Sequence, residues 1–561
     1  MEENSNQNQI EKSGQTDIKP DVKPDDKPKK KSSLVKKGLS LSVLTLFSRI
    51  LGLLRQMTQA KFLGTTALSD AFGVAFQIPN LFRRLFAENS ISVAFIPTFK
   101  GYLEDIKTQD GKKKAQNFVS ATFTLVTFAT VIFVTAGIIL TPLILKIYYK
   151  KADLESMLEA TVLTRIMFPY LVVISIAAFL QGILNGMKIF SPSGFTPILF
   201  NAIVIGTTYI LAPHMKNPAR AMATGVIIGG SVQALFQVPF VLKNKWSLRL
   251  TSLKKSFSNP GTRKVLSLIG PTILGMAAYQ LNDIVSSALA TRTGEGIYSS
   301  LSYSLRLQEL ILGICAVTIG TVILPDLTGF AKKEAWDKFN QMLIQSIRIM
   351  AFIAIPVTFY SLCMDRSLIA LLFQTGRFDE QSIEMTVQVF RCHIAGLYFI
   401  ALNRIVAPAF YAQQDTLSPT IAGLINFAVN MLLAIILSKF MGGPGIALAL
   451  TVASGANTVL LFVFLRKNQN VAVKNLVADT LLYTFRMIVF SVAASLPVML
   501  LRENILRIFE GHGRLISQGF PILITAIIFG FIGIALMFVT RDPLVKNISE
   551  KILRKIGRKS K

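Results

Sequence analysis

Long apolar stretches alternate with short polar ones through most of the chain, which is the pattern of a helical membrane protein. A helix needs about 20 mostly apolar residues to cross the ~30 Å hydrocarbon layer. We expect such helices at residues 38–62, 70–99, 116–146, 159–186, 194–213, 219–242, 264–291, 297–325, 336–364, 381–412, 417–439, 444–466, 476–501 and 516–540. The pattern therefore predicts an all-α membrane protein with fourteen transmembrane helices.

Basic residues gather in every second predicted loop, and this indicates how the chain is oriented. They lie at residues 100–114, 243–255 and 332–338 and in the last segment, 541–561. Loops rich in Lys and Arg stay on the cytoplasmic side of a membrane. The basic run Lys27–Lys37 directly precedes the first span. We therefore expect both termini in the cytoplasm.

Composition narrows the function classes. Mean hydropathy is +0.51 and 16% of residues are charged, which excludes a soluble globular protein. The net charge of +28 lies mostly in loops and tails, so we expect membrane lipids and not nucleic acid as partners. Three widely spaced cysteines argue against a disulfide framework. There is no nucleotide-binding G-x-x-x-x-G-K-[ST] loop and no H-E-x-x-H motif. A transporter is therefore favoured over an enzyme, and the sequence points to no definite cofactor.

Proline landmarks recur at a nearly constant offset, which indicates an internal repeat. The pairs are Ile96-Pro97 with Leu324-Pro325, Ser191-Pro192 with Ser418-Pro419, and Asn217-Pro218 with Gly443-Pro444, at offsets of 228, 227 and 226. We predict two parallel-repeat six-helix lobes around a central cavity, because such transporters place their substrate between the halves. The expected parts are a disordered basic tail (1–37), the N-lobe (38–242), a basic linker (243–263), the C-lobe (264–466), two further helices (467–540) and a basic tail (541–561).

Arginines lie inside the predicted spans, and from them we infer the function. Arg49 would lie about 16 Å into the first span at ~1.5 Å per residue, near the middle of the hydrocarbon layer. Arg83 has a similar depth in the second span, and Arg306 lies in the eighth, the repeat partner of the second. An arginine that faces lipid costs roughly 3 kcal/mol. We therefore expect Arg49, Arg55, Arg83 and Arg306 to line a cationic cavity and to bind the substrate.

A cluster of arginines suits a diphosphate, because each guanidinium donates paired hydrogen bonds to phosphate oxygens. Neighbouring polar residues are predicted to support the cavity: Asp70, Asn80, Arg84 and Glu88. The two carboxylates would hold the arginines in place and prevent irreversible binding. Local alternatives exist, since Arg84 can pair with Glu88, and Arg306 with Glu309, along one helix. Arg55 can also extend to the membrane surface.

Oxygen-bearing side chains in two C-lobe spans suggest an ion site. Asp283 lies in the seventh span, and Asn426 and Asn430 share one face of the eleventh. Sodium accepts such oxygen ligands, so these three residues are a candidate sodium site, and sodium or the membrane potential is the expected driving force. The alternative is hydrogen bonding between helices.

The segments FSRILGLLRQ and SDAFGVAFQIPNLFRRLFAEN resemble the MviN/MurJ lipid II flippase family, a branch of the multidrug/oligosaccharidyl-lipid/polysaccharide exporter superfamily. FPYLVVISIAAFLQGILN, GPTILG, LFQTGRF and APAFYAQQD extend the resemblance over about residues 38–540. It implies export of undecaprenyl-diphosphate-linked peptidoglycan precursor across the bacterial cytoplasmic membrane. It also implies essential roles for Arg49, Arg55, Arg83, Arg306, Asp70 and Glu88. Gln56 and Leu305 stand where family members often have Asp, so we expect no acid function there.

Three other functions are alternatives, and a substrate assay is needed to separate the first of them from lipid II transport. The first is a flippase for another polyprenyl-diphosphate glycan, which would need the same cavity chemistry. The second is a cation-coupled drug exporter of the same superfamily, although a site for organic cations should be acidic and aromatic. The third is a membrane scaffold that recruits cell-wall synthesis enzymes through its basic tails.

Overall fold

The computed structural model describes residues 29–88, 91–150 and 153–542, and this part of the chain is helical without strands. The elements are α1 (Lys29–Leu63), α2 (Ala67–Phe82), η1 (Arg83–Glu88), η2 (Ile91–Phe95), α3 (Ile96–Glu104), α4 (Gln109–Leu145), α5 (Leu154–Met167), α6 (Tyr170–Gly186), α7 (Ser191–Leu211), η3 (Ala212–His214), α8 (Pro218–Lys243), α9 (Leu253–Ser258), α10 (Pro260–Thr293), α11 (Ile297–Lys332), α12 (Trp336–Cys363), α13 (Asp365–Phe373), α14 (Glu380–Ala395), α15 (Leu397–Ala412), α16 (Leu417–Met441), α17 (Gly443–Leu465), α18 (Val473–Ile508) and α19 (Arg514–Val539).

Helices occupy each of the predicted spans in this part of the chain. Ten of the helical stretches are long and apolar enough to cross a membrane, and α5–α6 and α14–α15 each count as one. The predicted spans outside this set correspond to α1, α2–α3, α10 and α11, which include those with the candidate arginines. Helical membrane architecture is therefore confirmed.

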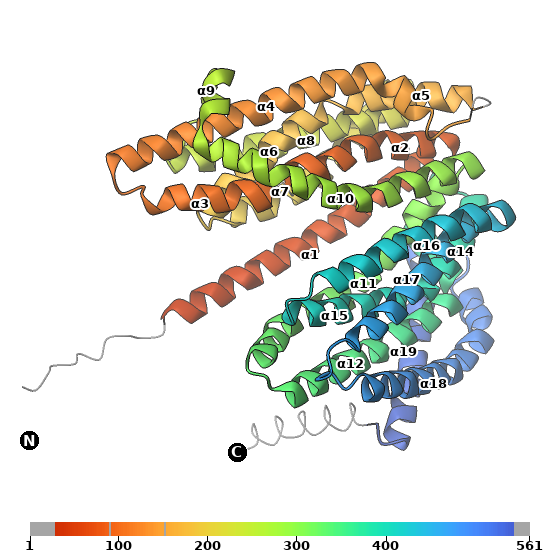
Figure 1. Cartoon of the computed structure of the whole chain (residues 1–561). Helices are drawn as coiled ribbons and strands as arrows, with labels where there is room; N and C mark the ends of the chain where they lie inside the picture. The colour runs from red at the N-terminus through yellow and green to blue at the C-terminus, as the bar shows by residue number, and fades with distance from the viewer. Residues whose placement is uncertain (1–28, 89–90, 151–152, 543–561) are drawn as a thin grey trace, which may run out of the picture.

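The helices form two groups that meet at one end and separate at the other (Figure 1). The N-lobe comprises α1–α8, and the C-lobe comprises α11–α17 with α18 and α19 packed beside α12 and α13. We call the end with the loops at residues 100–114, 243–255 and 332–338 the basic end. The lobes are apart at this end, where α1 begins, and together at the opposite end.

The same helix packing occurs in both lobes, as a parallel repeat requires. In the N-lobe α2 packs on α5, α4 on α6, α6 on α8 and α7 on α8. In the C-lobe α11 packs on α14, α12 on α15, α15 on α17 and α16 on α17. Even a left-handed turn residue recurs, since Lys188 (φ 64°) and Gln414 (φ 63°) occupy matching positions before α7 and α16.

The helix α10 is the element that joins the two groups. It contacts η1, η2 and α4 of the N-lobe as well as α16, α17 and α11 of the C-lobe. The linker before it belongs to the N-lobe, because Ser247 exchanges two hydrogen bonds with the side chain of Gln116 on α4. Relative motion of the lobes must therefore be absorbed within or after α10.

The second predicted span is not a continuous α-helix. Pro79 lies inside α2 and lacks the N–H that would bond to the preceding turn. The backbone then continues as π-helix in η1 and η2 before α3 begins. Wide π turns change the direction of side chains and often occur at functional sites. Here they carry Arg83 and Arg84.

The start of the first helix and one short helix differ most clearly from the sequence prediction. The first helix begins at Lys29 and not at Gly38, so the predicted disorder of residues 1–37 is wrong for Lys29–Lys37. No proline interrupts this stretch, and its many Lys residues are good helix formers. At ~1.5 Å per residue α1 is about 50 Å long, which exceeds the hydrocarbon thickness. The short helix α13 was not predicted. The predictions for the two tails cannot be compared at residues 1–28 and 543–561, which lie outside the described chain.

A paired carboxylate fixes α5 to α8 within the N-lobe. Arg220 donates from Nε and Nη2 to the two carboxyl oxygens of Glu159 at 2.8 and 2.7 Å, and Asn217 donates to the same group at 2.9 Å. Both charged side chains are less than one quarter exposed.

We expect Arg220→Ala to lower the free energy of unfolding by about 2 kcal/mol, because bonds to a charged group are lost and Glu159 stays half-buried. Thermal unfolding of the purified protein in detergent measures this as a lower Tm. Lys114→Ala is the matched control. Its pair with Asp110 is solvent-exposed, so its Tm should not change; equal effects of the two variants would contradict the assignment.

Candidate functional site

Two arginines cross between the lobes in opposite directions. Arg49 of α1 lies against Gly313 of α11, where a Cβ atom would occupy the position of its Nη1. Arg306 of α11 lies against Gly52 of α1, where a Cβ would collide with its Nη2. The absence of side chains at these glycines lets each guanidinium reach the opposite lobe. Arg49 and Arg306 therefore lie in one interface, as the sequence predicted for residues of both lobes.

Arg55 joins this group from the next turns of α1. Its Nε donates to Asn201 Oδ1 at 3.0 Å, and its guanidinium lies 5.4 Å from the centre of the Phe76 ring. It points into the protein and does not extend to the membrane surface. It is also near enough to Arg306 for the two positive charges to repel. An anion placed between them would relieve this repulsion.

A second group lies on η1 and α10. Arg83 donates from Nε to Asn80 Oδ1 at 2.7 Å, and the supporting role of Asn80 in the cavity stays a prediction. Arg84 pairs with Asp283 of α10 at 3.2 Å. The Glu88 side chain lies outside the described part of the structure, so its predicted role stays a prediction.

Glu309 connects the two groups electrostatically. It pairs with Arg306 at 3.5 Å, as the local alternative predicted, and it is near enough to Asp283 for the two carboxylates to repel. The groups together contain five arginines against Asp283 and Glu309. The described residues of the site therefore carry a clear excess of positive charge.

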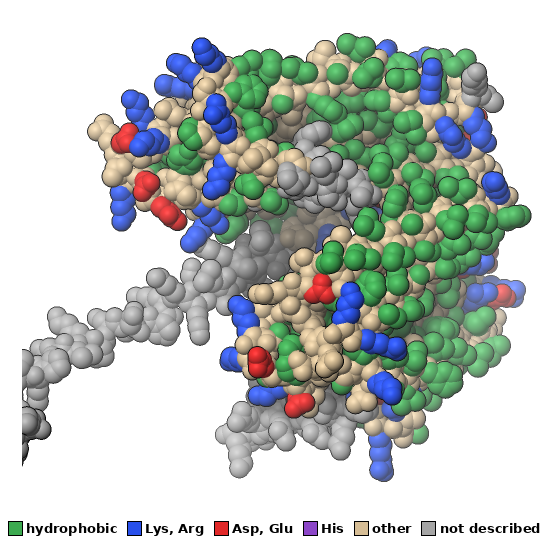
Figure 2. All heavy atoms as spheres, in the orientation of Figure 1, with side chains coloured by type: hydrophobic (Ala, Val, Ile, Leu, Met, Phe, Trp, Pro, Cys, Tyr) green, Lys and Arg blue, Asp and Glu red, His purple; other side chains and the backbone are tan. Residues whose placement is uncertain are grey.

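These side chains border open space between the lobes. The exposed fraction is 30% for the Arg306 side chain, 46% for Arg84 and 40% for Asp283. Figure 2 shows the surface hollowed between the two lobes, with basic atoms visible inside the hollow. Because guanidinium groups are stable at membrane depth only beside water or protein, this space must be hydrated. The arrangement can hold a multiply charged anion that enters from the basic end.

Asp70 has a different place from the one predicted. Its two carboxyl oxygens accept hydrogen bonds from the backbone N–H groups of Gly296 and Ser299, both at 2.8 Å. It lies in the first turn of α2, about 20 Å along the span from Arg83 at ~1.5 Å per residue. Asp70 therefore cannot hold the arginines, and that prediction is wrong. It joins the lobes at the end opposite the basic end.

Further bonds close the same end, and we call this set with Asp70 the seam. Thr65 and Ser382 join hydroxyl to hydroxyl at 2.8 Å, and the Tyr303 hydroxyl donates to Gly64 O at 3.1 Å. The Ala67 N–H donates to Glu295 at 2.9 Å. Backbones also approach closely: the N–H of Arg377 donates to Lys61 O at 2.9 Å.

Gly64 makes the closest of these approaches possible. Its φ of +59° is in the left-handed region, and a Cβ there would collide with Arg377 O. The sequence analysis missed the seam, although the TGRF segment that contains Arg377 was part of the family resemblance. Its bonds use mostly backbone groups, which carry no residue-specific signal.

The three predicted sodium ligands do not share a common contact. Asp283 pairs with Arg84, whereas Asn430 donates to Asn282 Oδ1 at 2.8 Å. The latter is a bond between α16 and α10, as the alternative reading expected. The carbonyl oxygens of Asn426 and Asn430 are buried and accept no hydrogen bond from the described residues. Across the described ranges, no group of three His, Cys, Asp or Glu residues is placed to hold a metal.

Comparison with known proteins decides the family. Residues 59–509 match the family described as lipid II flippase MurJ. The chain belongs to this family. The probable lipid II flippase MurJ of Treponema pallidum (strain Nichols) is 43% identical over 516 residues, which cover 92% of this chain and 97% of the relative. The lipid II flippase MurJ of Burkholderia cenocepacia is 33% identical, with 78% and 84% covered.

Solved structures support the same fold. A lipid II flippase MurJ in an inward closed conformation superposes with a TM-score of 0.72 at 23% identity, covering 90% of this chain and 99% of that one. An inward-facing multidrug transporter of the MOP superfamily superposes with a TM-score of 0.63 at 14% identity, covering 76% and 96%. The MurJ-family fold is therefore shared with transporters of other substrates.

We expect a Thr65→Cys/Ser382→Cys variant, in a background without native cysteines, to form a disulfide across the seam. The hydroxyl oxygens are 2.8 Å apart, close to the separation that a disulfide needs. Oxidation followed by gel electrophoresis after cleavage between the lobes measures it. A Lys100→Cys/Lys332→Cys pair at the basic end is the control and should not cross-link, because the lobes are apart there. Equal cross-linking of both pairs would contradict this description.

Proposed function

We propose that this chain is a lipid II flippase, a transporter that moves undecaprenyl-diphosphate-linked peptidoglycan precursor from the inner to the outer leaflet of the bacterial cytoplasmic membrane. The observation that carries the proposal is the meeting of Arg49, Arg55 and Arg306 between the lobes at membrane depth. Membership of the MurJ family supports the substrate class. The chain is an integral membrane protein, and its role is transport and not enzymatic catalysis.

Orientation follows from the distribution of charge. The basic end faces the cytoplasm under the positive-inside rule, which puts both termini there. The space between the lobes then opens toward the cytoplasm, where the precursor is made, and the seam closes the outer side. This is the state required to load the substrate.

The arginines bind the diphosphate, because several guanidinium forks converge on one space. Each donates paired hydrogen bonds to phosphate oxygens, and the anion removes the repulsion between Arg55 and Arg306. Glu309 and Asp283 compete for Arg306 and Arg84, so the bound lipid can be released. The sugars and peptide occupy the hydrated space, while the polyprenyl tail stays in the bilayer.

Transport requires that the seam opens while the basic end closes. Each seam bond contributes about 1 kcal/mol net, so the whole set is within the range that a charged substrate can offset by binding the two states differently.

The charge of the site also disfavours a drug exporter. A site for organic cations should be acidic and aromatic, whereas this one is rich in arginine.

We expect Arg49→Ala and Arg306→Ala, tested singly, to reduce lipid II translocation in reconstituted vesicles by about tenfold or more. The reason is that a lost bond to a charged group is worth about 1.5–3 kcal/mol. Arg466→Ala is the control, since this arginine is exposed at the end of α17, away from the site. Normal translocation by both site variants, with normal folding, would refute their assignment.

We further propose that sodium couples to this cycle at Asn426 and Asn430. Their orphaned buried carbonyl oxygens support the proposal, because a buried acceptor without a donor is costly and sodium accepts oxygen ligands. Asp283 adds negative charge on the adjacent α10. The membrane potential is the other candidate driving force.

If sodium binds there, Asn430→Leu should raise the sodium concentration needed for half-maximal lipid II translocation by about tenfold. A tenfold change corresponds to the loss of roughly 1.4 kcal/mol of binding free energy. Gln233→Leu is the matched control, because Gln233 also has an orphaned buried carbonyl oxygen but lies in the N-lobe. Translocation by the unmodified protein that is independent of sodium would dispose of the proposal and leave the potential as driving force.

A further inference from the structure

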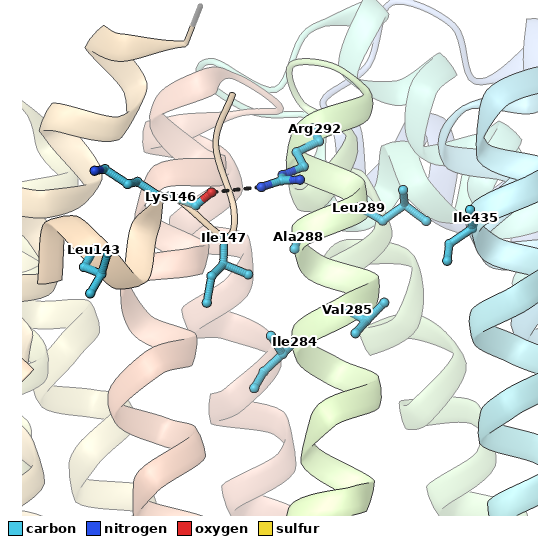
Figure 3. Close-up of a pocket in the computed structure, with 9 residues that line it drawn as sticks. All are labelled: Leu143, Lys146, Ile147, Ile284, Val285, Ala288, Leu289, Arg292 and Ile435. Carbon is cyan, nitrogen blue, oxygen red and sulfur yellow. Dashed lines mark hydrogen bonds between the residues drawn. The ribbon is translucent and has the colours of Figure 1, made fainter. Parts of the chain in front are cut away.

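A groove of about 660 Å³ crosses the boundary of the lobes on the outside of the helix bundle, at the same end as the seam. Figure 3 shows its floor on α10 and its two sides on the end of α4 and on α16. The lining is almost wholly apolar: Leu143 and Ile147 near α4, Ile284, Val285, Ala288 and Leu289 of α10, and Ile435 of α16. Leu143, Ile147 and Ile435 are exposed, with 61%, 52% and 41% of their surfaces accessible. At membrane depth such exposed apolar groups face acyl chains.

Two basic residues lie at one end of this groove, and Figure 3 shows the Lys146 side chain directed away from Arg292. Lys146 follows the last residue of α4, and Arg292 lies in the last turn of α10. Both side chains are exposed, and neither forms an ion pair with an acid in the part of the chain that the structure describes. The lining residues include no acid. Arg292 uses Nη2 to donate to Lys146 O at 2.8 Å (Figure 3), and its other N–H donors remain available.

The dimensions fit one phospholipid. From Arg292 to Ile284 the floor extends about 12 Å along α10 at ~1.5 Å per residue, which is most of the ~15 Å depth of one leaflet's hydrocarbon. The cations are at the helix ends, at the level of the headgroups, and the apolar lining is at the level of the acyl chains. Charge at the surface and apolar area below it are the complement of an anionic phospholipid.

We propose that this groove binds an anionic phospholipid of the outer leaflet, with its phosphate at Arg292, toward which the flexible Lys146 side chain would turn, and an acyl chain along α10. The lipid contacts α4 of the N-lobe and α16 of the C-lobe at the same time. It therefore favours the state in which the seam is closed. This site is separate from the substrate space, which lies between the lobes at Arg49 and Arg306, so the proposal does not depend on the proposed transport function.

A simpler role for Arg292 is to cap the end of α4, since cations stabilise the carbonyl-rich end of a helix. That role uses the carbonyl of Lys146 and not its side chain, so it leaves the second cation and the apolar groove without a function. Variants can separate the two roles. Lys146→Gln keeps the carbonyl and removes the charge, whereas Arg292→Lys keeps the charge and shortens the donor.

The test is native mass spectrometry of the full-length protein from nanodiscs of phosphatidylcholine with phosphatidylglycerol. We expect one phosphatidylglycerol to be retained in preference to phosphatidylcholine. Lys146→Gln and Arg292→Gln should each weaken this retention by about fivefold, the effect of about one surface cation, while Arg292→Lys should retain the lipid. Val285→Trp, which fills the groove and leaves both cations, should also lose it.

Lys150→Gln is the matched control, because Lys150 is an exposed lysine at the same end that does not line the groove. It should retain phosphatidylglycerol normally. Three results would overturn the proposal: equal retention of the two lipids, unchanged retention in both Gln variants of Lys146 and Arg292, or displacement of phosphatidylglycerol by inorganic phosphate alone. A Tm measured for each variant separates loss of the lipid from loss of the fold.

Discussion

The cost of placing guanidinium groups in hydrocarbon is the constraint on which the architecture depends. Arg49, Arg55 and Arg306 lie well inside long helices, and a bilayer offers no partner for them. They are stable because α1 and α11 face each other across hydrated space, and because Gly52 and Gly313 let the charges reach the other lobe. At this depth the lobes therefore contact each other through these long side chains, and their backbones approach more closely elsewhere.

The seam joins the lobes mainly through hydrogen bonds that involve backbone groups. Asp70 accepts from two backbone N–H groups, and most other seam bonds also use a backbone group. Bonds of this kind are individually weak, yet they have a definite geometry, so the end is either closed or open. A substrate that neutralises the arginines can then shift the equilibrium between the closed and the open seam. A lipid bound in the groove beside α10 would shift the same equilibrium toward the closed seam.

Much of the fold could be predicted from sequence because its causes are local or periodic. Apolar length located the spans, and the constant offset of prolines revealed two lobes that the repeated helix packing confirms. The cavity arginines were predictable for the same reason: a charge in an apolar run needs a polar environment wherever the helix is placed. Helix ends were less predictable, as α1 shows by starting at Lys29.

What the sequence by itself determined is that helices cross a membrane and that arginines from both lobes need a shared wet space. Only the tertiary structure decided which partners these residues have. Asp70 was expected beside the arginines but binds Gly296 and Ser299, and Arg84 pairs with Asp283 of α10. Asn201, Gly52 and Gly313 had no signal at all. The physical reason is that such contacts join residues far apart in the chain, and their identity depends on which helix faces meet and not on local composition.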